Sequence, residues 1–470
     1  MSLTVGGMEI DGRRLLFFLI IPGVALVIAA MLFAPPSLVK MALLAVLGIP
    51  LFLLLLDRPT LVFSLLTILI FSNVDVFTPV RLYRFVLVGL FAVFMVSLVQ
   101  GRRLVTHHPV LLALAGAFLI LAFQSLSVAR DLTVAVKRFD FIAKNLIGVA
   151  ITVQFVRDRN EFRRFLLLMA AGILLSDLLP LIIKPPTRFA SLSMVWSQGS
   201  FRYEGFVFEP NTFAMFQIFL IPVILSLMAV YRKPAAVKLV GMFSILTSIV
   251  VLVLSFSRGG FVGLAVLLLL LIILERKNKP LLAFGVVVIV LGFVLAPSVY
   301  WDRVESMLNY GRTGKPDFAI FTRLETMKTA VRLGLDNPLL GVGLDNFLVH
   351  SSRYVPFKMV VHNTFLEVFA ELGVFGLAAF AGIIGCNVLL MRRMAARRDD
   401  PEAAQIGRLL LVQHFGVLAT SMFIPIAYDV IFLYMLTLPA LADYAYRPAA
   451  LSPGSERALE GKEKALPFEA

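Results

Sequence analysis

Residues 361–367 read Val-His-Asn-Thr-Phe-Leu-Glu, and they restart a hydrophobic helix directly after a long polar loop. Thr364 and Glu367 have the spacing of a capping box, which predicts that the helix begins at Thr364. His362 then lies at the edge of an apolar segment, beside the positive end of the helix, where neutral imidazole is favoured. A titratable side chain in such a place is costly unless it is solvated or used, so His362 is a candidate functional residue.

The composition of the whole chain indicates a membrane protein. Of its 470 residues, 60% are hydrophobic and 15% are charged, and the mean hydropathy is +0.93. A soluble globule of this size would expose a large apolar excess, so lipid is the expected solvent. The sequence predicts an all-α integral membrane protein, a bundle of about 12–14 transmembrane helices with a long outer loop that contains an amphipathic helix.

Apolar runs long enough to cross a hydrocarbon core recur along the chain, and we count about fourteen of them. They lie at Leu15–Phe33, Leu38–Leu56, Leu61–Phe77, Leu82–Val99, Val110–Val128, Phe139–Val156, Phe165–Ile183, Phe213–Val230, Leu239–Phe256, Phe261–Leu274, Leu281–Ala296, Thr364–Met391, Leu409–Phe423 and Val430–Leu441. Residues 1–447 therefore form one polytopic domain. The polar segment 448–470 predicts a disordered cytoplasmic tail.

Lysines and arginines mark one side of the predicted bundle. If every span is counted, seven basic loops between Arg13 and Arg398 fall on the same side, which the positive-inside rule makes cytoplasmic. The long loops 184–212 and 298–361 then face outward. The net charge of +14 follows from this topology and from anionic lipid, so nucleic acid is not an expected partner, whereas membrane lipids are.

The longer outer loop is expected to contain a helix. Apolar residues in the segment 319–333 recur at helical spacing, which predicts an amphipathic helix that lies on the membrane or over the bundle. Its apolar face comprises Phe321, Leu324, Met327, Ala330 and Val331. The Asn-Pro pair at 337–338, together with Gly341 and Gly343, predicts a tight turn directly after this helix.

Arg258 joins two strongly apolar spans on the outer side, in a turn of almost no length. Two interpretations remain open. The guanidinium can snorkel to lipid headgroups, since no carboxylate lies nearby in the sequence. Alternatively, its planar fork holds a phosphate pair, and Gly259 and Gly260 let the backbone approach that ligand closely.

Arg202 lies in the shorter outer loop, shortly before Pro210, which is typical of a first helical turn. One interpretation is a surface ion pair with Glu204 or Glu209, which contributes little stability. The other is that Arg202 contributes to an electropositive bowl over an anionic ligand.

The remaining titratable and metal-binding patterns narrow the choice of chemistry. His350, in the longer outer loop, is the rival base to His362, and either histidine can instead simply bond its own loop. The sequence has no Asp-x-Asp, no Walker loop, no His-Glu-x-x-His and no cluster of cysteine and histidine. Its single cysteine, Cys386, makes no intrachain disulfide. We therefore expect neither a metal nor another cofactor.

Four motifs occur in a fixed order in the second half of the chain. They are Arg-Tyr-x-Gly-Phe…Pro-Asn at 202–211, Ser-Arg-Gly-Gly at 257–260, Asn-Pro-Leu-Leu-Gly-Val-Gly-Leu-Asp-Asn-Phe at 337–347 and His-Asn-Thr-Phe-Leu-Glu…Glu-Leu-Gly at 362–373. Each motif is weak alone, but the ordered set resembles the O-antigen ligase and polymerase superfamily. The similarity covers about residues 202–376.

The resemblance implies a metal-independent glycosyltransferase of the bacterial inner membrane, with its site on the periplasmic side formed by loops 184–212 and 298–361. The implied donor is a glycan on undecaprenyl diphosphate, and the implied acceptor is lipid A-core or another glycan. Other polysaccharide-assembly proteins are further expected partners. By the same resemblance, His362 is the catalytic base, while Arg258 and Arg202 hold the donor diphosphate. Supporting roles fall to Arg323, Glu209, Asn363 and Glu367.

Two other classes of protein compete with this interpretation. A transporter of a small anion such as bicarbonate would place charge near the middle of the bilayer, where Lys144 and Asp177 are the main candidates. A structural scaffold for polysaccharide assembly would leave the arginines and the histidine unexplained. Charge concentrated on the outer rim favours the enzyme. The sequence leaves open whether the enzyme is a ligase or a polymerase.

Overall fold

The computed structural model describes residues 2–5, 8–11, 59–72, 108–183, 194–197, 200–203, 209–231, 235–276, 318–356 and 359–447, with a few isolated positions at 87–89, 91, 94–95 and 305. The chain divides into two compact units. One comprises Met1–Leu66 and Leu82–Arg103, and the other comprises Thr67–Arg81 and Leu104–Ala470. In the first unit, strands β1 (Ser2–Val5) and β2 (Met8–Asp11) form an antiparallel hairpin.

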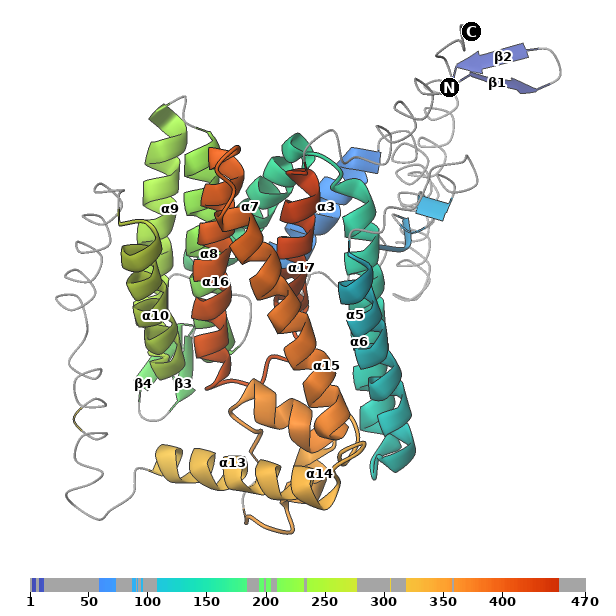
Figure 1. The fold of residues 1–470 in the computed structure, drawn as a ribbon, viewed down its shortest axis with the longest axis vertical. Helices are drawn as coiled ribbons and strands as arrows, with labels where there is room; N and C mark the ends of the chain where they lie inside the picture. Colours follow the sequence, from blue (N-terminus) through green and yellow to red (C-terminus); the bar gives the residue numbers. More distant parts are fainter. Residues whose placement is uncertain are drawn as a thin grey trace, which may run out of the picture. The chain divides into compact units, whose positions relative to one another are not determined.

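The second unit is built of helices (Figure 1). They are α5 (Pro109–Gln124), η2 (Ser125–Val128), α6 (Leu132–Phe155), α7 (Arg159–Ile183), α8 (Pro210–Val230), α9 (Ala235–Leu254), α10 (Arg258–Leu274), α13 (Phe318–Asp336), α14 (Phe347–Ser351), α15 (Thr364–Ala395), α16 (Pro401–Ser421) and α17 (Val430–Ala445). Helix α3 (Pro59–Ser72) crosses the boundary between the two units. A second antiparallel hairpin is formed by β3 (Met194–Ser197) and β4 (Ser200–Tyr203).

The predicted class, an all-α membrane protein, is confirmed. Among the described helices, four are long and apolar enough to cross a membrane, namely Pro109–Val128, Pro210–Val230, Ala235–Leu254 and Thr364–Ala395. In the described part of the chain, ten of the predicted spans coincide with helices, from α3 to α17. The spans predicted at Leu15–Phe33, Leu38–Leu56 and Leu281–Ala296, most of Leu82–Val99, and the tail 448–470 lie outside the described residues.

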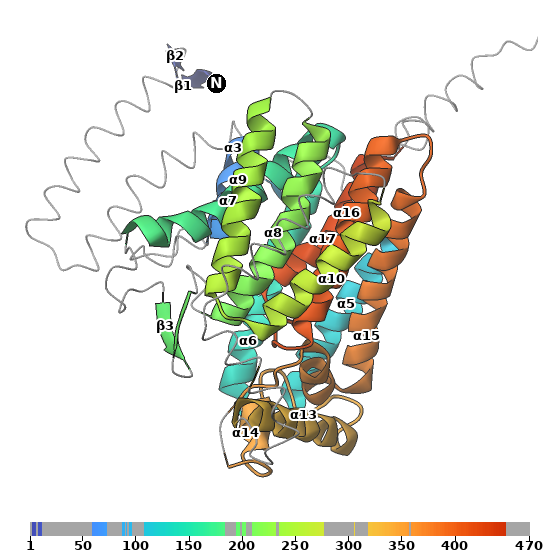
Figure 2. The ribbon, with the colours of Figure 1, turned by 90° about the vertical axis from the view of Figure 1, so that its left-hand side faces the viewer.

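Helix α8 occupies the centre of the second unit and is buried along nearly its whole length. It packs against α7, α9, α10 and α16, which Figures 1 and 2 show around it. Small residues allow the closest approach of α10 to α16, because a Cβ added at Gly263 would lie 2.0 Å from Thr420 Oγ1. Close backbone packing through small residues is the usual source of helix association in lipid.

Helix α15 is broken at Gly373, whose φ is +67°. The turn that follows α13 fills the break: the Val342 amide donates to the Ala370 carbonyl at 2.9 Å, and the Val374 amide donates to the Pro338 carbonyl at 2.8 Å. Figure 1 shows the first segment of α15, residues 364–372, turned away from the axis of the rest. The predicted turn at 337–343 is confirmed, and it sets the direction of this segment.

Helix α13 confirms the amphipathic helix expected over the bundle, but another face makes the contact. It packs on the first segment of α15, where Gly334 approaches the ring of Phe369. Helix α13 buries Thr322, Thr326, Thr329, Ala330 and Leu333. From the predicted apolar face, Phe321, Leu324 and Val331 remain exposed.

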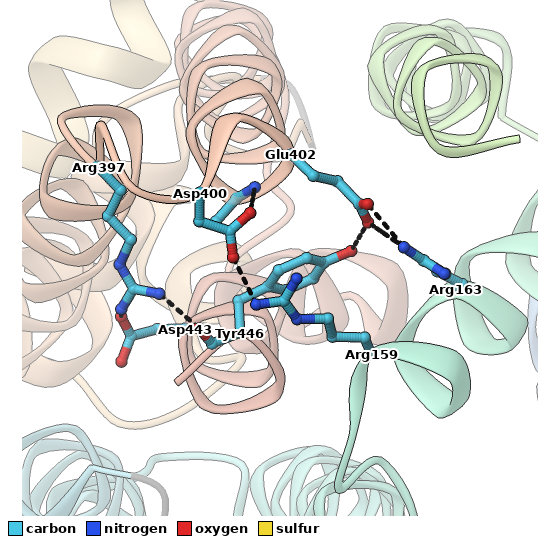
Figure 3. A network of polar contacts seen from close by, with 8 residues as sticks. Arg159, Arg163, Arg397, Asp400, Glu402, Asp443 and Tyr446 are labelled. Atoms are coloured by element: carbon cyan, nitrogen blue, oxygen red, sulfur yellow. Dashed lines mark hydrogen bonds and ion pairs between the residues drawn. The ribbon is translucent and has the colours of Figure 1, made fainter. Parts of the chain in front are cut away.

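At the opposite end of the unit, a network of charged groups joins the ends of α7, α15, α16 and α17 (Figure 3). Arg159 pairs with Asp400, and Arg397 pairs with Asp443. Glu402 accepts from Arg163 at 2.6 Å and also from the Tyr446 hydroxyl. Two basic loops that the sequence assigns to one side of the membrane, around 157–164 and 392–398, thus meet at one end of the bundle.

We predict that Gly341→Ala destabilises the protein. The φ of Gly341 is +65°, and a Cβ there would lie 2.3 Å from the Glu371 carbonyl carbon. The left-handed conformation alone costs a non-glycine residue about 1–2 kcal/mol, before the clash is counted. Thermal unfolding in detergent measures the effect as a lower Tm. The matched control is Gly385→Ala, since nothing lies within 4 Å of a Cβ at Gly385. Equal Tm values for the two variants would contradict the role of the turn.

Candidate active site

Three of the described helices, α8, α10 and α15, begin at the same end of the bundle. The N-terminus of α10 abuts that of α8, since a Cβ at Gly260 would lie 2.6 Å from the Cβ of Ala214. The N-terminus of α15 contacts the loop after α16, where the Asn363 side-chain amide, Nδ2, donates to the Met422 carbonyl at 3.3 Å. Each helix N-terminus carries a partial positive charge. Their convergence favours an anionic ligand at this end.

The start of α15 at Thr364 is as predicted, but the predicted capping box is wrong. Asn363 is the N-cap, and its Oδ1 accepts from two amides of the first turn, both at 3.0 Å. The Thr364 hydroxyl instead donates to the Ile424 carbonyl at 2.7 Å and accepts from the Ile426 amide at 3.0 Å. Asparagine caps a helix as well as threonine does, which releases Thr364 to hold the loop after α16.

Glu367 also bonds the loop after α16, and it does not bond the N-cap residue as a capping box requires. The Ala427 amide donates to the Glu367 carboxylate, while Oε2 is buried without a hydrogen-bond partner in the part of the chain that the structure describes. One turn later, the Glu371 carboxylate accepts from the Asp345 amide at 2.9 Å and from the Tyr428 hydroxyl at 3.1 Å. These carboxylates hold the two loops that flank the first segment of α15.

His362 lies directly before Asn363 and is half-buried. Its Nδ1 is buried, with no hydrogen-bond partner among the described residues. Burial is the main cause that lowers the pKa of His362 to about 4, the positive charge of Arg323 lowers it further, and Glu209 raises it. The imidazole is therefore neutral at physiological pH, as the sequence predicts, although burial and Arg323 are the causes.

Arg323 and Glu209, whose charges act on the pKa of His362, belong to different elements. Arg323 belongs to α13, and Glu209 is the N-cap of α8. The Glu209 carboxylate accepts from the Thr212 amide at 2.5 Å and from the Asn211 side chain at 2.7 Å. These bonds fix Glu209 at the N-terminus of α8, so its negative charge is held in place near the imidazole.

Arg258 is the first residue of α10 and follows a strained turn. Phe256 has a φ of +51°, a conformation that costs a bulky residue of order 1–3 kcal/mol and persists only where the surroundings enforce it. Ser255 Oγ donates to the Leu252 carbonyl at 2.6 Å, and Ser257 Oγ accepts from the Gly260 amide at 3.1 Å. The local structure thus fixes the backbone from which the half-buried Arg258 projects.

Gly259 and Gly260 lie in close packing contacts, and the approach of their backbone to a phosphate pair stays a prediction. A Cβ at Gly259 would lie 2.8 Å from the Cβ of Phe423, and one at Gly260 would meet α8. Both glycines therefore serve close packing within the protein. The contact of Gly259 with Phe423 also relates Arg258 to His362. Gly259 follows Arg258 and packs on Phe423, whereas Asn363 follows His362 and donates to the Met422 carbonyl. The residues next to Arg258 and His362 therefore contact two consecutive residues of the loop after α16.

Arg202 lies in β4, opposite Val195 of β3, and its side chain is outside the described residues. The sequence predicted no strand here. The next residue, Tyr203, anchors the hairpin: its hydroxyl donates to the Asp177 carbonyl at 2.6 Å, and its ring meets Phe213 edge-on at 5.3 Å. The hairpin is therefore fixed near the N-terminus of α8, at the same end as the other candidates.

The rival base has different surroundings. His350 lies in α14, and burial, Arg353 and Arg130 lower its pKa. Its Nε2 is buried and lacks a hydrogen-bond partner in the described ranges. The groups that act on His350 thus differ from the Arg323 and Glu209 that act on His362.

Sequence reasoning missed Arg138 and Tyr428. Arg138 Nε donates to Asp345 Oδ2 at 3.1 Å, and the guanidinium lies 6.0 Å from the centre of the Tyr428 ring. Both residues support Glu371, which the quoted motif does contain. Arg138 lies one residue before the predicted span Phe139–Val156. A charged residue at the edge of a span is a candidate functional residue, so its position in the sequence could have identified Arg138.

Comparison with known protein families agrees with the resemblance seen in the sequence. Residues 243–381 match the family model described as O-antigen ligase. The matched segment includes Arg258, Arg323 and His362, whereas Arg202 and Glu209 precede it. A comparison with curated proteins finds no match. Residues 243–381 of this all-α membrane protein are thus similar to the O-antigen ligase family, which supports the O-antigen ligase and polymerase superfamily.

Proposed function

We propose that the protein moves a glycan from undecaprenyl diphosphate to an acceptor hydroxyl, without a metal, on the periplasmic side of the inner membrane. The observation that carries this proposal is the half-buried His362, which lies directly before α15 at the end of the bundle where α8 and α10 also begin, within the electrostatic influence of Arg323 and Glu209. The family match supports a glycosyltransferase of the ligase type. The acceptor is lipid A-core in a ligase and a second lipid-linked glycan in a polymerase.

The negative charge of the diphosphate leaving group accounts for the positive charge of the arginines and helix N-termini at the candidate site. When the anomeric C–O bond of the donor breaks, the diphosphate keeps the bonding electrons, and its negative charge needs stabilisation where it develops. Arg258 supplies a full positive charge, and the N-termini of α8, α10 and α15 supply partial positive charges, at one end of the bundle. Arg202, on the anchored hairpin, is the second arginine assigned to the diphosphate.

The acceptor needs a base, and we assign that role to His362. As the acceptor oxygen attacks the anomeric carbon, its proton passes to a nitrogen of the neutral imidazole. Glu209 stabilises the imidazolium that forms, whereas Arg323 opposes it. A donor diphosphate bound near Arg323 would offset the charge of that arginine, so the proton affinity of His362 rises when the donor is bound. Asn363 holds the end of α15 on which this geometry depends.

We predict that His362→Ala abolishes transfer but not folding. Loss of a general base costs about 10²–10⁴ in rate. Transfer from lipid-linked donor in proteoliposomes, donor binding and Tm are measured together, and the matched control is His350→Ala. The expected result is loss of transfer in the first variant only, with donor binding kept. An inactive His350→Ala beside an active His362→Ala would exchange the roles of the two histidines and refute the mechanism.

Arg258→Lys keeps the charge but removes the bidentate fork. If Arg258 grips the diphosphate, the loss of a charged hydrogen bond of about 1.5–3 kcal/mol lowers turnover roughly 10–100-fold. Steady-state transfer rates measure the change. Arg276→Lys is the control, since the exposed Arg276 lies just beyond the opposite end of α10. Near-normal transfer by Arg258→Lys would remove this residue from the site and favour contact with lipid headgroups.

The pH dependence follows from the pKa of His362. Because that pKa is about 4 in the free protein, the acid limb of kcat/KM should lie near pH 4, with transfer retained at pH 5. Arg323→Met removes a charge that lowers the pKa, so the limb moves upward toward the ordinary histidine value. Glu209→Gln removes a charge that raises it, so the limb moves downward. A limb that stays in place in both variants would show that another group controls the profile.

A further inference from the structure

Two fully buried polar side chains meet inside the bundle, between α7 and α8. The Gln217 side-chain amide, Nε2, donates to Asp177 Oδ1 at 2.8 Å, and both residues are 0% exposed. The other oxygen of each group, Asp177 Oδ2 and Gln217 Oε1, is buried with no hydrogen-bond partner in the described part of the chain. One oxygen of each side chain therefore makes no hydrogen bond to a described residue.

An ionised carboxylate suits this place poorly. It would receive one hydrogen bond in an apolar interior, with no ion pair to a described lysine or arginine, and burial of such a charge costs several kcal/mol. The two unused atoms, as an ionised carboxylate and a neutral amide present them, are both acceptors, and no described donor bonds either of them. One proton on Asp177 Oδ2 would supply the donor that Gln217 Oε1 lacks.

We propose that Asp177 is a neutral carboxylic acid and a positioning residue. Its O–H donates to Gln217 Oε1, while Gln217 Nε2 donates to Asp177 Oδ1, so two hydrogen bonds in a closed ring join α7 to α8. The pair holds in register the two helices that support the β3–β4 hairpin.

The link to the hairpin is direct. Tyr203 of β4 donates to the backbone carbonyl of Asp177 itself. The ring of Tyr203 packs on Phe213, which lies one turn before Gln217 on α8. The residue before Tyr203 is Arg202, so the acid–amide pair fixes the backbone that carries a proposed diphosphate ligand. This last step rests on the proposed function, whereas the protonation of Asp177 does not.

The competing assignment makes Asp177 a charged group that works as an ion or proton carrier. Ser176 Oγ is also buried with no partner among the described residues, so a monovalent cation between these oxygens is the specific alternative. The other mid-chain candidate, Lys144, forms an exposed pair with Asp140 and is not part of this cluster. A carrier needs Asp177 to lose its proton, and the acid–amide pair needs Asp177 to keep it.

Asp177→Asn separates the two assignments. Asparagine can replace both hydrogen bonds, because its amide nitrogen donates to Gln217 Oε1 and its oxygen accepts from Gln217 Nε2. We expect unchanged Tm, kcat and donor KM in this variant. Asp177→Leu and Gln217→Leu have similar bulk but no hydrogen bonds, so each should lower Tm by several degrees and raise the donor KM more than it lowers kcat.

Two further measurements need no substrate. The infrared spectrum of the wild type at neutral pH should contain a protonated-carboxyl C=O band that Asp177→Asn lacks. Replacing sodium by choline should leave Tm unchanged in both proteins. The proposal is overturned by an inactive but stable Asp177→Asn, by the absence of the band, or by sodium stabilisation lost in Asp177→Asn. If wild-type protein transfers no glycan, the proposed function fails, while the infrared and Tm results still decide the state of Asp177.

Discussion

The candidate site depends on the break in α15. Uninterrupted, this helix would run straight to its first residue, but the left-handed Gly373 lets residues 364–372 turn aside, and the carbonyls freed by the break accept amides of the 337–347 turn. In lipid or at its surface, a broken helix is tolerated only when its backbone groups find such partners. The interruption directs His362 toward the loop after α16 and brings α13, with Arg323, alongside.

Positive charge at this site comes from two sources with different properties. Helix N-termini provide fixed partial charges and need no counter-ion, so three of them at one end cost little to bury. Arginines provide full charges, because the guanidinium group stays protonated throughout the physiological pH range. Glu209 connects the two sources, because it caps α8 and also offsets part of the effect of Arg323 on His362.

Most of the described helices could be predicted because apolar length is a local signal. The start at Thr364 was predicted from a capping box that does not form, and it is correct because the neighbouring Asn363 caps the helix instead. The choice of cap was not local: Asn363 and Thr364 can both cap, and the contact of Thr364 with residues 424 and 426 decides between them. Arg138 and Asp345 lie 207 residues apart, so their pairing leaves no trace in either segment. Gly259 and Gly260 were correctly noticed, but only the neighbouring helices reveal that they serve packing.

The charged network at the other end of the bundle has a mechanical consequence. Arg159 at the start of α7 is tied to Asp400, and Arg163, one turn further on, is tied to Glu402 of α16. The 25 residues of α7 extend about 37 Å from that tie at 1.5 Å per residue, so a tilt of about 5° moves the far end by roughly 3 Å. Helices held in this way act as levers with a fixed base. We therefore expect tilting of α7 to displace its far end much more than the clamped end.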